Sequence, residues 1–264
     1  MEYVVSFSTG LSSALTTIRV LDKHSDTKVV FMDTLFEDDD NYRFMSDFEN
    51  KFGIEIIKLA EGRTPYEVSR DEHVIPNSFV APCTRRLKVD VFKKYLLTIE
   101  GNITIYIGYD FMELHRCEAT TRNYNKLGYI VDYPLLWKPY EMRNYSDVVR
   151  QDWGIEPPRM YALGYTHANC GGRCVKQGKG DWIRTLINFP KRYAEIEQWE
   201  NDMRQNEVNQ NYALLKTQTA GGNIPMTLTE LRETHENKNA DPKLFDYDSA
   251  CVVCGIGDLL CEEA

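Results

Sequence analysis

Short apolar runs alternate with helix-like patterns along the first half of the chain. Five runs read as β-strands because they are brief, rich in β-branched or aromatic residues, and bounded by turn residues. They cover residues 3–7, 27–32, 54–59, 103–109 and 130–136. Helical patterns cover residues 14–21 and 42–52, and residues 79–97 read as a loop followed by a helix. The alternation predicts an α/β fold, a parallel sheet with helices on both faces.

The pattern changes after about residue 140. From residue 146 onward it is helical and loop-like, with helices expected at 181–189, 193–206 and 227–236. Residues 207–211 and 219–223 read as a polar stretch and a loop. We therefore expect an α/β domain over residues 1–140 and a mostly helical C-terminal region over residues 141–264.

Composition and charge narrow the class of protein. No signal-peptide pattern and no apolar run of the roughly 20 residues needed for a membrane span occurs, which predicts a cytoplasmic protein without a membrane partner. The net charge of −9 argues against broad wrapping of nucleic acid. Residues 37–40 are acidic, whereas residues 173–192 carry six Lys or Arg and one Asp. The basic stretch reads first as a solvated helix face, with a local anion or RNA contact as the alternative.

The first strand runs into a loop of small residues, Ser8-Thr9-Gly10-Leu11-Ser12-Ser13. Small side chains let backbone N–H groups approach an oxyanion, hydroxyls add donors, and the following helix points its positive end at the charge. The order S-x-G-x-x-S lacks the Lys of a Walker A loop and is not the G-x-G-x-x-G of a dinucleotide site. The loop indicates a phosphate site, with a plain strand-to-helix turn as the alternative.

Further polar residues follow other strands, and in open α/β sheets ligands bind beyond the carboxyl ends of the strands. Asp33 and Thr34 follow the second strand, where Asp33 reads either as a helix cap or as an acceptor for a ribose, an adenine edge or a metal. Near the end of the fourth strand lie Gly108, Asp110, Glu113, His115 and Arg116. Carboxylate, imidazole and guanidinium groups at one strand end suit phosphate or acyl-phosphate chemistry, although a lone His is more often a surface residue.

Four of the seven cysteines form two close pairs, Cys170-x₃-Cys174 and Cys251-x₂-Cys254. Four thiolates suit structural Zn²⁺, and Gly255 after the second pair is typical of a metal knuckle. A [4Fe–4S] cluster is the rival, because spacing does not choose between the metals, and ordinary thiols are the third reading. Cys83 and Cys117 read as loop residues or sulfur carriers.

Five ordered segments resemble one family. They are Val30-Phe31-Met32-Asp33-Thr34 with Glu37, Pro82-Cys83-Thr84-Arg85-Arg86-Leu87-Lys88, Ile107-Gly108-Tyr109-Asp110 through Arg116, Tyr133-Pro134-Leu135-Leu136-Trp137, and Asn169-Cys170-Gly171-Gly172-Arg173-Cys174-Val175-Lys176. They resemble the phosphoadenosine-phosphosulfate (PAPS) reductases and N-type ATP pyrophosphatases, which have the HUP-like, adenine nucleotide alpha hydrolase-like fold, and in particular a bacterial and phage-encoded branch. The chain departs from the family at Thr9, where Gly is common, and at Ser12, where Asp or Lys is common.

The resemblance implies ATP or a related adenine nucleotide with Mg²⁺. The implied binding residues are Ser8, Thr9, Gly10, Ser12, Ser13, Asp33, Thr34, Arg85, Lys88 and Gly108. The implied catalytic residues are Asp110, Glu113 and Arg116. Implied partners are an acceptor such as tRNA or DNA, a sulfur donor protein and a second copy of the chain, in the host cytoplasm if the gene is phage-borne.

Three functions stay open at this point. The first is an ATP pyrophosphatase-type enzyme that adenylates a substrate for sulfur or nitrogen insertion. The second is a sulfonucleotide reductase, for which Cys261 is a poor nucleophile because its acidic neighbours would raise the thiol pKa. The third is a nucleotide-binding protein without catalysis, favoured by Thr9 and Ser12.

Overall fold

The computed structural model of the protein describes residues 1–205, 209–219 and 222–237. Its centre is a five-stranded sheet in the order β3-β2-β1-β4-β5 with every pair parallel. The strands are β1 (Glu2–Phe7), β2 (Lys28–Asp33), β3 (Ile56–Ala60), β4 (Ile103–Tyr106) and β5 (Ile130–Asp132). The predicted α/β fold with a parallel sheet is confirmed.

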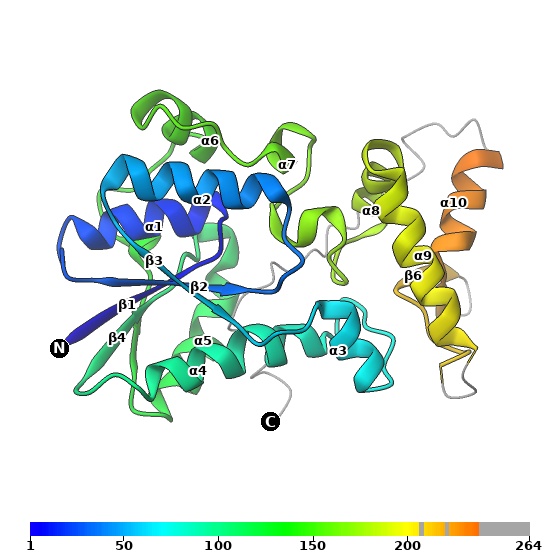
Figure 1. Ribbon diagram of the computed structural model, residues 1–264, viewed down its shortest axis with the longest axis horizontal. Coiled ribbons are helices and arrows are strands. Elements are labelled where there is room, and N and C mark those ends of the chain that lie inside the picture. The colour runs from blue at the N-terminus through cyan, green and yellow to red at the C-terminus, as the bar shows by residue number, and fades with distance from the viewer. Residues whose placement is uncertain (206–208, 220–221, 238–264) are drawn as a thin grey trace.

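Helices cover both faces of this sheet (Figure 1). On one face α1 (Leu11–Leu21) and α2 (Asp39–Phe52) bury Phe7, Phe31 and Phe48 in one core cluster. On the other face α4 (Asp90–Leu96) and α5 (Leu114–Asn125) bury Phe92 and Tyr124 in a second cluster. The strand order reverses between β1 and β4, which is where ligands bind in open sheets of this kind.

Several elements differ from their expected extents. β4 ends at Tyr106 and β5 at Asp132, short of the expected residues 109 and 136, and a 3₁₀ turn, η3 (Pro134–Leu136), follows β5. The pattern did not predict α3 (Pro65–Asp71) or α5. The helix expected within residues 79–97 begins with the π-helical segment η1 (Thr84–Val89), which continues into α4. A π-helical turn is rare and is found frequently at functional sites.

The C-terminal region contains short helical segments and three longer helices. Its elements are α6 (Tyr145–Asp147), η4 (Val148–Asp152), α7 (Arg159–Ala162), η5 (Asn169–Gly172), α8 (Lys179–Asn188), α9 (Pro190–Arg204), β6 (Leu215–Thr219), β7 (Gly222–Met226) and α10 (Leu228–Asn237). The antiparallel β6–β7 hairpin was not expected. The buried Glu200 carboxylate of α9 accepts the backbone N–H groups of Leu214, the residue before β6, and of Leu228, the first residue of α10.

The longer C-terminal helices α8, α9 and α10 lie beyond the carboxyl ends of the parallel strands (Figure 1). Trp182 and Tyr193 share a core cluster with Tyr66 and Ile75 from the first half of the chain. Val149 and Ile155 pack in the cluster that also holds Phe7. Residues on both sides of position 140 therefore share cores. Within the described ranges, no helix has the length and apolar character to cross a membrane.

Candidate functional site

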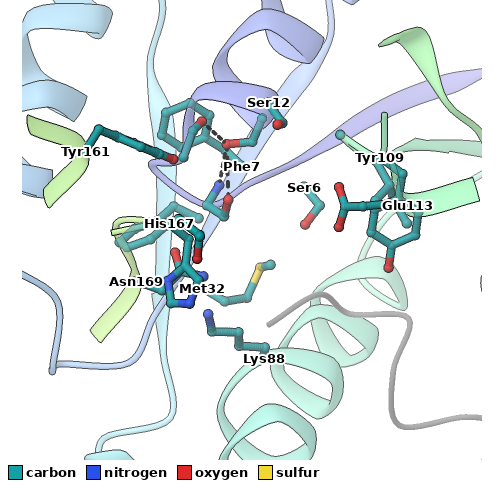
Figure 2. A pocket seen from close by; sticks show the side chains of 17 residues that line it. Ser6, Phe7, Ser12, Met32, Lys88, Tyr109, Glu113, Tyr161, His167 and Asn169 are labelled. Atoms are coloured by element: carbon teal, nitrogen blue, oxygen red, sulfur yellow. Dashed lines mark hydrogen bonds between the residues drawn. The ribbon is translucent and has the colours of Figure 1, made fainter. Parts of the chain in front are cut away.

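A cavity lies where β1, β2 and β4 end, at the point where the strand order reverses (Figure 2). Its volume is about 110 Å³. Pockets that enclose whole small molecules span roughly 300–1,000 Å³, so this cavity fits one part of a nucleotide, such as a phosphate group. Seven of the binding and catalytic residues that the family resemblance implied line this cavity: Ser8, Gly10, Ser12, Ser13, Lys88, Gly108 and Glu113.

The small-residue loop is held by its own hydroxyls. The Ser13 hydroxyl accepts the Ser8 N–H at 3.0 Å and donates to the Gly10 carbonyl at 2.8 Å. Gly10 is the N-cap of α1, whose first turn contains no acidic residue. The positive end of an 11-residue helix therefore faces the cavity, an arrangement that favours an anion.

Thr9 adopts a left-handed backbone conformation, with φ of 60°. This conformation costs a residue with a Cβ atom roughly 1–2 kcal/mol and costs glycine little, which explains why a glycine suits the position. The Thr9 side chain is fully buried, and its hydroxyl donates to the Ser8 carbonyl at 2.6 Å. Thr9 thus shapes the loop without lining the cavity.

Tyr161 reaches the same loop from α7. Its hydroxyl lines the cavity and accepts the N–H of Leu11 at 3.2 Å, so the C-terminal region caps the start of α1. Burial raises the pKa of Tyr161 to about 12, so the phenol is neutral. The sequence pattern gave no sign of this residue, which lies 150 positions from its partner.

Lys88, His167 and Asn169 line the side of the cavity opposite Tyr109 and Glu113 (Figure 2). Lys88 projects from η1 and is 8% exposed, and His167 is 7% exposed. Burial, with a further contribution from Lys88, lowers the pKa of His167 to about 4, so its imidazole is neutral near pH 7. Asn169 belongs to the quoted N-C-G-G-x-C segment, but nothing in the sequence placed it or His167 beside Lys88.

Glu113 is the carboxylate in the cavity wall. It forms a close ion pair with Arg116, whose guanidinium is buried and stacks on the Tyr109 ring at 4.2 Å. Burial raises the pKa of Glu113, and Arg116 opposes that shift. The pair places a carboxylate at the cavity with a cation behind it. Arg116 itself does not line the wall.

Besides Thr9 and Arg116, four expected binding or catalytic residues lie outside the cavity wall. Asp33 accepts the Tyr42 hydroxyl and the Leu35 N–H, both at 2.8 Å. Thr34 donates to Glu37, and Asp110 caps the turn at Met112. The Arg85 side chain is 62% exposed, with its Nε 4.0 Å from Asp90. His115 is exposed as well.

The acidic residues after β2 position the cysteine-containing loop. The buried Glu37 carboxylate accepts the Cys170 N–H at 2.8 Å and an Asn41 side-chain N–H. Asp38 has no exposed surface and accepts from both Arg159 and Arg192. Arg192 also donates to the Gly171 carbonyl at 2.9 Å. Two members of the basic stretch are therefore structural: Arg192, and Arg173, which stacks on Phe36 at 3.6 Å.

Cys170 and Cys174 are buried and pack against Phe36. The Phe36 ring lies 5.4 Å from that of Tyr66, whose pKa is raised first by burial and then by Cys174, Cys170 and Cys83. The sequence did not associate Cys83 with this pair. Among the described residues, no three His, Cys, Asp or Glu side chains are placed to hold a metal ion. Cys251 and Cys254 lie outside those residues.

Comparison with known proteins decides the family of the first part of the chain. Residues 2–108 match the family described as phosphoadenosine phosphosulfate reductase domain. They form a PAPS reductase domain. The family resemblance predicted from the ordered motifs is thereby confirmed, and this domain supplies the S-x-G-x-x-S loop, Lys88 and Gly108.

Two individual proteins are similar to the chain. An uncharacterized protein of Methanocaldococcus jannaschii is 26% identical over 211 residues, which cover 76% of this chain and 41% of that protein. The chain thus spans about two fifths of the length of this curated relative. The crystal structure of a PAPS reductase from Candida auris in complex with phosphate superposes with a TM-score of 0.46 at 13% identity, covering 63% of this chain and 79% of that one.

Proposed function

We infer that the protein binds ATP or a related adenine nucleotide and uses it to activate an acceptor. The observation that carries this proposal is the joint placement of the α1 N-terminus and the buried Lys88 at one small cavity of a PAPS reductase domain. A buried lysine and a helix N-terminus together favour a phosphate group over a neutral ligand. The adenosine would extend out of the cavity, which is too small for a whole nucleotide.

The proposed reaction is adenylation. An acceptor oxygen forms a bond to the α-phosphorus of ATP, the bond to the β-phosphate oxygen breaks, and pyrophosphate leaves with that electron pair. The α1 N-terminus and Lys88 would stabilise the negative charge that develops on the phosphates. A sulfur or nitrogen nucleophile would then form a bond to the acceptor atom that carries the adenylated oxygen, and AMP would leave with the electron pair of the bond that breaks. The acceptor would be a tRNA, a DNA or a small molecule, and a sulfur donor protein would supply the sulfur.

A magnesium ion suits this site. Mg²⁺ in nucleotide enzymes is held by one or two carboxylates together with substrate phosphates, and Glu113 offers a carboxylate in the cavity wall. When bound, the ion would neutralise charge on the leaving pyrophosphate. Arg116 would keep the Glu113 carboxylate ionised despite its burial.

Sulfonucleotide reduction is the second candidate, and the match of residues 2–108 to the PAPS reductase domain favours it. That reaction needs a thiolate that attacks the sulfur of PAPS. Cys261, the cysteine nearest the chain end, lies between Leu260 and Glu262 and outside the described residues. Its acidic surroundings in the sequence keep adenylation as our first choice.

Two product assays separate these functions. With ATP, Mg²⁺ and a cell extract as the source of acceptor, adenylation predicts pyrophosphate release that stops in a Lys88→Ala variant and continues in Arg85→Ala, whose side chain is exposed. Sulfite released from PAPS in the presence of a dithiol would instead establish the reductase. Tight ATP binding with neither product would establish a non-catalytic nucleotide-binding protein.

We also propose a metal centre held by Cys170, Cys174, Cys251 and Cys254. Its support in the described part of the chain is the burial of the first two thiols and the anchoring of their loop by Glu37. The sequence favours zinc slightly, because Gly255 directly after Cys254 is typical of a metal knuckle and because a redox cluster more often lies beside the nucleotide, a proximity that the sequence does not establish. Asn169 lines the cavity and precedes Cys170 directly, and this adjacency supports a [4Fe–4S] cluster over Zn²⁺. Either metal would link the Cys170–Cys174 loop to the segment that contains Cys251 and Cys254, and a cluster would add electron transfer.

Metal analysis tests the centre. We expect anaerobically purified protein to be brown, with absorbance near 400 nm and about four irons per chain, as a thiolate-bound cluster requires. Cys174→Ser and Cys254→Ser should each lose the metal, whereas Cys117→Ser should keep it. One tightly bound zinc would restore the zinc assignment. Protein that contains neither metal and whose four thiols react freely when native would contradict the centre.

A further inference from the structure

His167 brings an ionisable group from the C-terminal region to the cavity of the PAPS reductase domain. It follows α7 in the chain, is 7% exposed, and lines the same cavity as the anion-binding loop (Figure 2). A buried imidazole in the wall of a ligand cavity differs from an ordinary core histidine, because the ligand becomes its neighbour.

Few charged groups share the cavity with His167. The titratable groups that share the cavity are Lys88 from η1, Tyr109 and Glu113 near the end of β4, and Tyr161 from α7. The Glu113 carboxylate is paired with Arg116, and the phenol of Tyr161 is neutral. Lys88 is therefore the charge that acts most directly on His167, and it opposes protonation of the imidazole.

We propose that His167 contacts the bound anion of the nucleotide and takes up a proton from solvent when that anion enters the cavity. This inference rests on the proposed nucleotide function. It adds a second cation to the Lys88 side of the site, and that cation forms only when the anion is bound. The empty cavity would thus avoid two adjacent buried positive charges, and the occupied cavity would provide both.

The attraction between a phosphate charge and a protonated His167 is large enough to cause this proton uptake. Two unit charges about 4 Å apart at an effective dielectric constant of about 20 interact strongly enough to raise an imidazole pKa by roughly three. Burial and Lys88 hold the pKa of His167 at about 4 without ligand. A phosphate charge within hydrogen-bond reach would therefore bring it to about 7, so roughly half a proton is taken up at that pH.

Calorimetric titration of ATP at pH 7 in buffers of different ionisation enthalpy measures this proton directly. We expect the wild-type protein to take up about 0.5 proton more than a His167→Asn variant, which should also bind ATP more weakly. His115→Asn provides the matched control, because it makes the same change at an exposed histidine and should leave both the affinity and the proton count unchanged. If His167→Asn does not fold, the ring ¹⁵N shifts of His167 in the wild-type protein, with and without ATP, provide the same test.

The outcomes separate the two proposals. ATP binding with equal proton uptake in the wild-type and His167→Asn proteins, or with ring shifts that stay those of a neutral imidazole, would overturn the role of His167 and leave the nucleotide function standing. If the wild-type protein binds neither ATP nor PAPS, the proposed function fails, and this inference fails with it.

Discussion

Two glycines near the cavity are required for different physical reasons. A Cβ atom on Gly108 would lie 2.9 Å from both the Ser12 carbonyl oxygen and the Thr16 hydroxyl. The end of β4 therefore packs directly on the first turns of α1, and there is no room for a side chain. A Cβ atom on Gly10 would lie 3.4 Å from the Ser8 hydroxyl and from that of Tyr161, which is ordinary contact.

Gly108→Ala should therefore destabilise the protein by about 1–3 kcal/mol, the usual cost of overpacking, because α1 must move away from β4. Gly10→Ala provides the matched control and should change the free energy of unfolding by less than about 1 kcal/mol, since only an ordinary contact is added. Urea denaturation of both variants measures the difference. Equal stability of the two variants would show that β4 and α1 are not in tight contact.

At the scale of elements, one carboxylate holds the C-terminal region against the start of α2. Asp38 is buried and caps α2 through the Asp40 N–H at 3.0 Å, while its oxygens accept from Arg159 and Arg192. Burial alone would raise its pKa, but the two arginines outweigh that effect and lower the pKa of Asp38 below its usual value. The acidic run thus acts within the fold.

Asp38→Asn should destabilise the protein by about 2 kcal/mol, since it keeps a capping oxygen but removes the charge that both arginines need. The native pKa lies below the unfolded value of about 3.9, so the stabilisation is complete above that pH and is lost as the pH falls through the native pKa. The gap in unfolding free energy between the wild-type and variant proteins should therefore be constant above about pH 4 and shrink below it. Asp47→Asn, at the half-exposed partner of Arg43, should change stability by less than about 1 kcal/mol.

Elements with an apolar signature were predictable, and those without one were not. The core strands and α2 follow from their hydrophobic spacing. The α5 helix escaped because it buries mostly polar side chains, among them Arg116, Thr120 and Asn123. The β6–β7 hairpin is largely exposed and shows no alternation of apolar and polar residues. β4 was read as too long because Ile107 and Tyr109 are also core residues, although they lie beyond the strand.

At the scale of the whole molecule, the site is assembled from two distant parts of the chain. The S-x-G-x-x-S loop, Lys88 and Gly108 were identified from sequence, because they belong to motifs that the PAPS reductase domain shares. Tyr161 and His167 were not, because periodicity carries no information on contacts between residues 150 positions apart. The motif that contains Arg85 was recognised as well, but a sequence motif does not show that this side chain points to solvent.

The central claim is that a nucleotide phosphate binds at the N-terminus of α1, and titration of ATP into a Gly10→Val variant tests it most directly. Gly178 is also an N-cap glycine and has φ of −80° against −82° at Gly10, so Gly178→Val makes the same backbone change at α8, away from the cavity. We predict that both variants fold, that Gly178→Val binds ATP like the wild-type protein, and that Gly10→Val does not bind it, because the added methyl groups block the approach of phosphate to the loop. Equal ATP affinity of folded Gly10→Val and wild-type protein would contradict the account.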